Sequence, residues 1–281
     1  MEVRPLATAF PDRVMLYSVL DVAARAPSSG NLQPWLWRVD GAALHLYADW
    51  RRKAGESPTD LRDVLLGCGA VLDHCVVALA AAGWCPQVRR FPDGGRASHL
   101  AILEVVEQPP TAGCLELAGA ISRRRADRRR YPAGRIPPAT LELLYVRAPR
   151  MGVELAIVPR SRWTRHEDFS VALRFAGVVG EPDDDAVLLV LGTREDNGEM
   201  RLRAGEALSH ISSTVTALGL ASCPLTAPLN DMRSRSALAC EVFDGEAHPQ
   251  ALIRLGLPPA DDRPWLPTER RPVSETTAWT S

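Results

Sequence analysis

The stretch AARAPSSGNLQPWLWRV, residues 23–39, places a polar turn between a helix and a strand. Pro27 ends the preceding helix, because its ring lacks an N–H and disfavours helical geometry at Ala26. The next four residues, SSGN, carry two hydroxyls and one side-chain amide, and a strand is predicted over Trp35–Val39. Such a turn suits a planar ligand with polar edges. The alternative is a structural corner whose Ser and Asn side chains bond their own backbone.

Helices and strands alternate along the chain without the regular strand–helix–strand repeat of a doubly wound sheet, so the sequence predicts an α+β fold. One long helix, which Thr59 or Asp60 would cap and which continues to about Ala82, is apolar on nearly all sides and should be buried. The other predicted elements are helices over 14–26, 115–124, 139–148 and 202–218, and strands over 35–39, 43–48, 99–106, 154–158, 187–191 and 251–255.

Two internal similarities, in the same chain order, indicate an ancient duplication. The two long helices match at an offset of 136 residues, which aligns Gly69 with Gly205. Upstream, Arg-Ala-Pro at 25–27 recurs at 147–149, each time after a helix and before a strand. The second copy lacks the Ser, Asn and Gln residues of the first. We therefore expect that only the first copy kept the polar turn.

The composition limits the classes of partner. With 281 residues, of which 46% are hydrophobic, the chain can bury a substantial core, and its net charge of −1 gives no overall attraction to nucleic acid. The six cysteines form no C-x-x-C pair, no metal-binding motif occurs, and no signal-like segment opens the chain. The longest apolar run, Val64–Trp84, is interrupted by Asp73 and His74. These patterns indicate a cytoplasmic protein without metal, membrane or nucleic-acid partners.

Six arginines crowd the end of one predicted helix and the turn after it: Arg123, Arg124, Arg125, Arg128, Arg129 and Arg130. They could form a solvated helix end, since cations stabilise the C-terminal end of a helix dipole. They could form a nucleic-acid surface, although no aromatic platform accompanies them. They could also form a phosphate clamp, because guanidinium groups match phosphate oxygens bidentately.

Beyond these local patterns, APSSGNLQPW resembles the APSxxNxQPW signature of the nitroreductase superfamily, whose members bind FMN at a dimer interface. The segment LRDVLLGCGAVLDH at 61–74 and the closing RRPV at 270–273 resemble the Acg-type actinobacterial branch, which has two nitroreductase-like halves in one chain. The similarity extends from about Leu16 to Glu275. In the turn it implies flavin contacts from Pro27, Ser28, Ser29, Asn31 and Gln33.

The stretch RRRADRRRYP resembles the RRSxR stretch that holds the FMN phosphate in this superfamily. The resemblance implies that Arg124 and Arg128 bind the phosphate, with Arg125 beside them. Ala126 stands where Ser or Thr is usual, which removes a hydrogen bond of about 1–3 kcal/mol to a charged group.

Two further segments carry the resemblance towards the C-terminus. PTERRPVSE resembles the tail that completes the phosphate pocket, which implies roles for Arg270 and Arg271. GLASCPLTAPL resembles the stretch whose backbone faces flavin N5, and Leu225 and Thr226 are the residues at that position.

The two halves complement each other under this interpretation. Residues 1–114 form a nitroreductase-like half that has the turn but no preceding arginine stretch, and residues 115–281 form a half that has the arginine stretch but a degraded turn. We therefore expect a nitroreductase-like fold in which two fused halves form an intrachain pseudo-dimer. It would hold one complete flavin site and one defunct site, as a monomer or as a homodimer of such chains.

The expected function is that of an FMN-dependent oxidoreductase, which passes hydride from NAD(P)H through flavin N5 to a small organic acceptor, without a catalytic side chain. The alternative is an Acg-like protein that sequesters FMN under a lid and does not turn over. The segment that would hold this lid, Trp163–Asp185, is short and ends in an acidic loop, which favours the enzyme. A third hypothesis, an arginine-rich nucleic-acid binder, predicts no flavin and a steep salt dependence.

Overall fold

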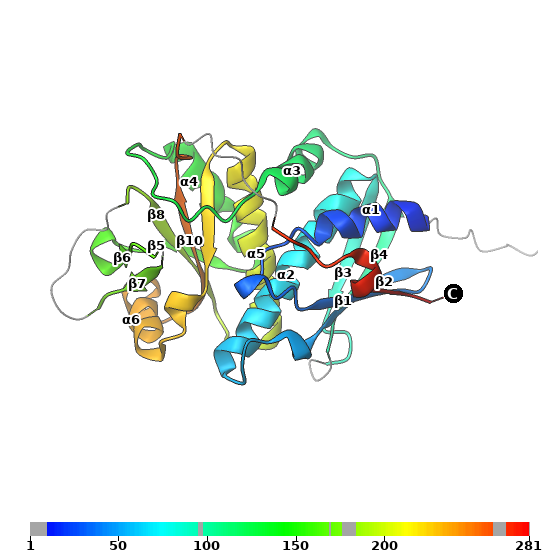
Figure 1. Ribbon diagram of the computed structural model, residues 1–281, viewed down its shortest axis with the longest axis horizontal. Helices are drawn as coiled ribbons and strands as arrows, with labels where there is room; N and C mark the ends of the chain where they lie inside the picture. Colours follow the sequence, from blue (N-terminus) through cyan, green and yellow to red (C-terminus); the bar gives the residue numbers. More distant parts are fainter. Residues whose placement is uncertain (1–9, 95–97, 169, 176–183, 261–267, 281) are drawn as a thin grey trace, which may run out of the picture.

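The computed structural model describes residues 10–94, 98–168, 170–175, 184–260 and 268–280. Two sheets lie at opposite ends of the molecule, and two long helices, α2 (Pro58–Ala81) and α5 (Gly198–Ala217), pack together between them (Figure 1). One hydrophobic cluster joins α2 to the first sheet and another joins α5 to the second. The predicted α+β fold is confirmed.

The two sheets have the same topology. The first contains β1 (Trp35–Val39), β2 (Ala43–Ala48), β4 (His99–Glu107) and β3 (Trp84–Arg90) in that spatial order. The second contains, in the same order, β5 (Glu154–Ile157), β8 (Val187–Thr193), β10 (His248–Gly256) and β9 (Ala221–Leu225). Every neighbouring pair among these strands is antiparallel, and each long helix connects the second strand of its set to the edge strand. This correspondence supports the proposed duplication.

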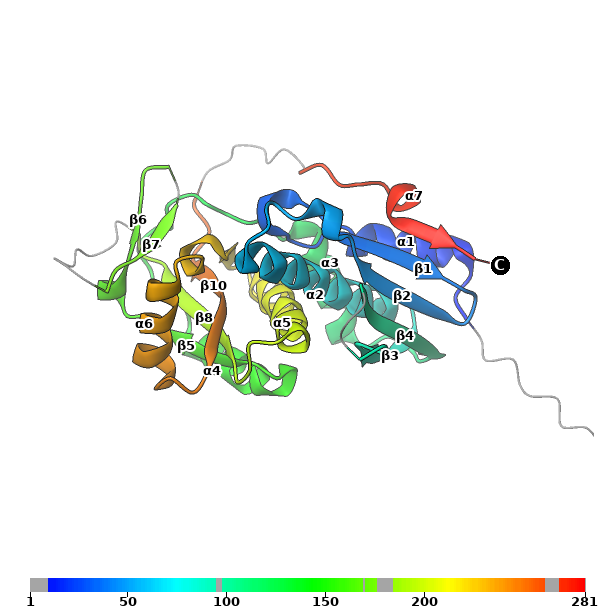
Figure 2. The same ribbon diagram turned by 90° about the horizontal axis from the view of Figure 1, so that it is seen from below.

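The chain returns to the first sheet at its C-terminal end. Strand β11 (Thr277–Trp279) pairs in parallel with β1 and forms the edge next to it (Figure 2). Residues 268–271 lie on the path from the second sheet to this strand, beside the turn that follows α1 (Arg13–Ala23). The proposed boundary between halves, at residue 115, therefore does not separate the two sheets completely.

The remaining elements cover these layers. They are α3 (Ala112–Arg123), α4 (Pro138–Arg147), α6 (Met232–Phe243), α7 (Val273–Thr276), the hairpin strands β6 (Trp163–Arg165) and β7 (Val171–Leu173), and the short 3-10 helices η1 (Ser29–Asn31), η2 (Trp50–Arg52), η3 (Pro149–Met151), η4 (Arg160–Arg162) and η5 (Ala227–Leu229).

Several elements differ from the sequence-based expectation. Ser57, rather than Thr59 or Asp60, caps α2, and Asp60 completes a capping box by binding back to the Ser57 backbone. Strands β3 and β9 were not predicted, because each contains a proline, Pro86 and Pro224. Both strands lie at a sheet edge, where a residue without an N–H is tolerated.

Helix α2 has the length and composition of a membrane span, with a mean hydropathy of 2.0 over its most apolar window. However, 83% of that window is buried inside the protein. This burial is typical of a core helix, and it accounts for a helix that is apolar on nearly all sides.

Two glycines set how closely α2 and α5 approach. A Cβ atom on Gly69 would lie 2.0 Å from the backbone oxygen of Leu202, and one on Gly205 would lie 2.1 Å from that of Leu66. The two contacts are reciprocal, since each joins residues of the pairs that the 136-residue offset aligns. The helices therefore cross about a local twofold axis, as the same helix from two subunits would in a symmetric dimer.

We expect Gly205→Ala to destabilise the protein by about 1–3 kcal/mol, because backbone atoms must move apart to admit the methyl group. This loss should exceed the gain of about 1 kcal/mol in helix propensity. The matched control is Gly113→Ala in α3, where the nearest atom would be the Thr111 hydroxyl at 4.0 Å. Urea unfolding monitored by circular dichroism gives both values, and equal stability of the two variants would contradict the packing argument.

Candidate cofactor site

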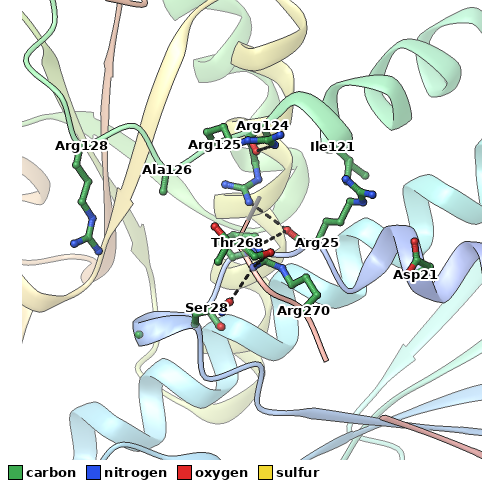
Figure 3. A pocket seen from close by; sticks show the side chains of 13 residues that line it. Asp21, Arg25, Ser28, Ile121, Arg124, Arg125, Ala126, Arg128, Thr268 and Arg270 are labelled. Carbon is green, nitrogen blue, oxygen red and sulfur yellow. Dashed lines mark hydrogen bonds between the residues drawn. The ribbon is translucent and has the colours of Figure 1, made fainter. Parts of the chain in front are cut away.

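A cavity of about 510 Å³ opens where the two halves meet (Figure 3). This volume lies within the range of about 300–1,000 Å³ that is usual for small-molecule and cofactor sites. The first half contributes the end of α1 and the turn after it, and the second half contributes the end of α3, the segment after it and the C-terminal tail. The lining residues are Asp21, Arg25, Pro27, Ser28, Gly30, Asn31, Ile121, Arg124, Arg125, Ala126, Arg128, Thr268 and Arg270.

The turn after α1 has an unusual backbone conformation. Gly30, Asn31 and Gln33 have φ values of 56°, 57° and 49°, in the left-handed region. Glycine adopts it readily and asparagine tolerates it, but glutamine needs support there. The Gln33 backbone N–H donates to the Ser28 hydroxyl at 2.9 Å, and the Gln33 side-chain oxygen accepts from the Arg271 backbone N–H at 2.8 Å. The C-terminal tail therefore helps to hold the turn in this shape.

Two arginines of the second half, Arg124 and Arg270, face the cavity, and neither forms an ion pair with any residue that the structure describes. Arg124 is only 5% exposed, and its Nη2 donates to the backbone oxygen of Arg25 at 3.2 Å. Arg270 donates to the same oxygen at 3.4 Å and to the Asn31 side chain at 3.0 Å. In the described part of the chain, the Nε and Nη1 atoms of Arg124 and the Nε atom of Arg270 have no hydrogen-bond partner.

The charge on these arginines is costly in the absence of an anion. Burial, together with the positive charges of Arg270 and Arg125, lowers the pKa of Arg124 to about 10. Burial also lowers the pKa of Arg270, as do the charges of Arg25 and Arg125. Buried charges are normally paired, and neither the buried Arg124 nor the partly buried Arg270 forms an ion pair with any residue that the structure describes. Phosphate is the anion whose geometry guanidinium groups match best, so the pair has the chemistry of a phosphate clamp.

The remaining cavity arginines are less buried. Arg125 is half-buried and binds the backbone oxygens of Ser122 and Arg124, each at 2.8 Å. Arg128 is exposed and lies away from the buried pair, on the other side of Ala126 (Figure 3). The family resemblance implied that Arg124, Arg128 and Arg270 hold the phosphate together. All three line the cavity, and Arg124 lies next to Arg270, since both donate to the backbone oxygen of Arg25.

The structure gathers some of the predicted site residues and not others. Those that line the cavity are Pro27, Ser28, Asn31, Arg124, Arg125, Arg128 and Arg270. Those that are not among its lining residues are Ser29, Gln33, Leu225, Thr226 and Arg271. Gln33 and Arg271 bind each other, as described above, and the Thr226 hydroxyl donates to Asp63 at 3.1 Å. Their roles as flavin contacts stay predictions.

Sequence reasoning missed several lining residues. Arg25 opens the Arg-Ala-Pro element that recurs later in the chain, so the repeat could have identified it. Asp21 lies in the last turn of α1, and Arg25 lies in the turn just after this helix. Thr268 and Ile121 carried no signal, since only the tertiary arrangement brings them to the cavity.

We expect inorganic phosphate to raise the unfolding temperature of the wild-type protein, by the equivalent of about 2.7 kcal/mol at 100 times its Kd. Arg124→Met should abolish this response. Without phosphate, the variant should be at least as stable as the wild type, because it removes a buried charge and two unpaired donors. Arg123→Met is the matched control, since Arg123 is exposed and does not line the cavity. A phosphate response that survives Arg124→Met would contradict the clamp.

Comparison with known proteins places this chain in a family, although no family model matches it. The "Putative NAD(P)H nitroreductase Rv3131" of Mycobacterium tuberculosis is 37% identical, over 97% of this chain and 93% of its own. The "Putative NAD(P)H nitroreductase acg" of the same organism is 30% identical, over 93% of this chain and 94% of its own. Among solved structures, one described as a putative nitroreductase from Anabaena variabilis shares the fold, with a TM-score of 0.55 at 11% identity over 89% of this chain and 90% of that one. The chain therefore belongs to the nitroreductase superfamily, and Acg is among its relatives.

Proposed function

We propose that the chain binds FMN in this cavity and is an oxidoreductase that uses NAD(P)H to reduce a small organic acceptor. The observation that carries the proposal is the convergence of two separate motifs. The polar turn of the first half and the buried arginines of the second half line one cavity, although they lie about a hundred residues or more apart in sequence. The names of the relatives, which contain NAD(P)H nitroreductase, support the same chemistry.

The residues present fit FMN. The unpaired donors of Arg124 and Arg270 would bind its phosphate, and this would neutralise the charge that burial makes costly. The Ser28 and Asn31 side chains, with the backbone of Gly30, would face the polar edges of the ring system. Arg128 would supply a positive charge at the more open side of the cavity. When bound, FMN supplies the hydride chemistry, so no catalytic side chain is needed.

We further propose that one chain is a complete intrachain pseudo-dimer with a single flavin site. The matched sheets and the reciprocal glycine contacts of α2 and α5 support this arrangement, because they reproduce within one chain the symmetry of a dimer. The second half offers no equivalent of the turn: η3, which follows its Arg-Ala-Pro element, contains Pro149–Met151 and carries no hydroxyl or amide side chain.

The presence or absence of a lid over the flavin distinguishes a protein that sequesters FMN from an enzyme. The segment 163–185 forms, in its described part, the short hairpin of β6 and β7. Arg165 in this hairpin donates to the backbone oxygen of Arg128 at 3.3 Å. Residues 169 and 176–183 lie outside the described residues, so the expectation of a truncated lid stays a prediction. We favour the enzyme on the relatives' names and treat sequestration as an outcome of the test.

We expect the purified protein to bind one FMN per chain, measured by visible absorption after gel filtration with excess FMN. Anaerobic addition of NADPH or NADH should then bleach the flavin band at 450 nm. Arg270→Met should weaken binding by roughly tenfold to a hundredfold, because it removes a charge-assisted bond worth about 1.5–3 kcal/mol.

The stoichiometry and the choice of reductant distinguish the alternatives. Absence of bound flavin would refute the proposed site, and two flavins per chain would refute the idea of one defunct site. A flavin that dithionite bleaches and neither nicotinamide reduces would favour sequestration. Arg123→Met again serves as the matched control and should bind FMN as the wild type does.

A further inference from the structure

Asp63, in the second turn of α2, lies between the two halves beside the cavity. Its Oδ2 atom accepts a hydrogen bond from the Thr226 hydroxyl at 3.1 Å, and Thr226 directly follows β9 of the second sheet. The side chain of Ser29, which begins η1 in the first-half turn, also interacts with this carboxyl group and favours its charged form. One carboxylate thus connects the turn, the central helix and the second sheet.

Asp63 is largely buried and held by its neighbours, unlike a carboxylate on the protein surface. Its side chain is 13% exposed, and burial raises its pKa, an effect that the interactions with Ser29 and Thr226 and the charge of Arg62 partly offset. The Oδ1 atom has no hydrogen-bond partner among the described residues, and the nearest Arg62 nitrogen is 3.7 Å away. A carboxylate of this kind in the protein interior is costly unless it has a role.

We infer that Asp63 is a positioning residue for the candidate site, which fixes the turn at 28–31 against the end of β9 and places a negative charge beside the cavity. The Ser29 and Thr226 hydroxyls, which the sequence suggested as flavin contacts, are used for this purpose. Because Ser28, Gly30 and Asn31 line the cavity on either side of Ser29, fixing Ser29 fixes the wall that they form. Asp63 lies in the segment 61–74 that carries the family resemblance, but the sequence assigned it no role.

The close contact of α2 with the turn makes this anchoring effective. A Cβ atom on Gly67, one helical turn after Asp63, would lie 3.2 Å from the Ser28 Cβ and 3.2 Å from the Pro34 ring. The helix therefore packs directly under both ends of the turn, and Asp63 adds the polar connection between them. The negative charge also offsets part of the field of the cavity arginines, and it would oppose the addition of electrons to a bound flavin.

The first test measures the turn in the flavin-free protein. Hydrogen exchange should be roughly five- to tenfold faster at the Asn31 and Leu32 amides in Asp63→Ala and in Thr226→Val, because these amides bond the Ser28 and Ser29 carbonyls within the turn. Glu116→Gln, which removes an exposed carboxylate from α3, is the control and should leave this exchange unchanged. Unchanged exchange in folded Asp63→Ala protein would overturn the positioning role.

The second test measures the effect of the Asp63 charge on the potential of a bound flavin, and it therefore rests on the proposed function. At pH 8, Asp63→Asn should shift the midpoint potential of the flavin to a more positive value, whereas Thr226→Val keeps the carboxylate and should not. The difference from wild type should shrink as the pH falls through the raised pKa of Asp63, because the wild-type carboxylate then takes up its proton.

The outcomes that would contradict the proposed function, the positioning role and the electrostatic role of Asp63 can be told apart. A wild-type protein that binds no flavin would refute the proposed function, while the exchange measurement would still decide whether Asp63 positions the turn. A bound flavin whose potential is the same in Asp63→Asn and wild type at pH 8 would overturn the electrostatic part of the inference. Circular dichroism of each variant shows that it is folded.

Discussion

The close approach of α2 and α5 is the constraint on which the rest of the molecule depends. Each helix contributes one glycine at the crossing, and each glycine contacts a backbone oxygen of the other helix, so no side chain separates the two halves there. This crossing determines how the first sheet faces the second. It therefore also determines that the turn after α1 meets the segment after α3, and the candidate site exists because of this meeting.

The sequence predicted the parts of this arrangement that have local causes. Strands β1 and β2 were predicted at their observed bounds, since Trp35–Val39 and Ala43–Ala48 flank a short turn and have strand-forming residues. The match between Gly69 and Gly205 is visible in the sequence as a repeat, but its physical reason, the reciprocal contact of the helices, is visible only in the structure. Strands β3 and β9 escaped prediction because their prolines are tolerated only at a sheet edge, and edge position is a tertiary property.

The site was predicted less completely for a similar reason. The motif residues Ser28, Asn31 and Arg124 could be found because a resemblance identified them one by one. The resemblance also implied a role for Arg270, but sequence spacing could not show that Arg270 and Arg124 share one backbone acceptor, because they are far apart along the chain. Likewise Asp63, which accepts a hydrogen bond from Thr226 and interacts with Ser29, lies in a segment that carries the resemblance, but its position between the halves follows only from the packing of α2.

The buried arginines illustrate a conflict between stability and binding. An unpaired guanidinium in a protein interior lowers stability, and native structures retain such groups mainly where a ligand or reaction uses them. Arg124 and Arg270 share one backbone acceptor, which holds two like charges close together. Only an arrangement fixed from several sides could keep them there, and the turn, the tail and the central helices provide it.

The position of β11 has a consequence for biosynthesis. The first half leaves the ribosome with the β1 edge uncovered, and an uncovered edge strand is a site for unwanted pairing with other chains. Its partner strand, and the arginine that bonds Asn31, are made much later than β1; the Asn31–Glu269 contact alone spans 238 positions. The cavity is therefore completed only after Arg270 has been made, so a nascent chain that stops before this residue has neither a protected sheet nor an intact anion clamp.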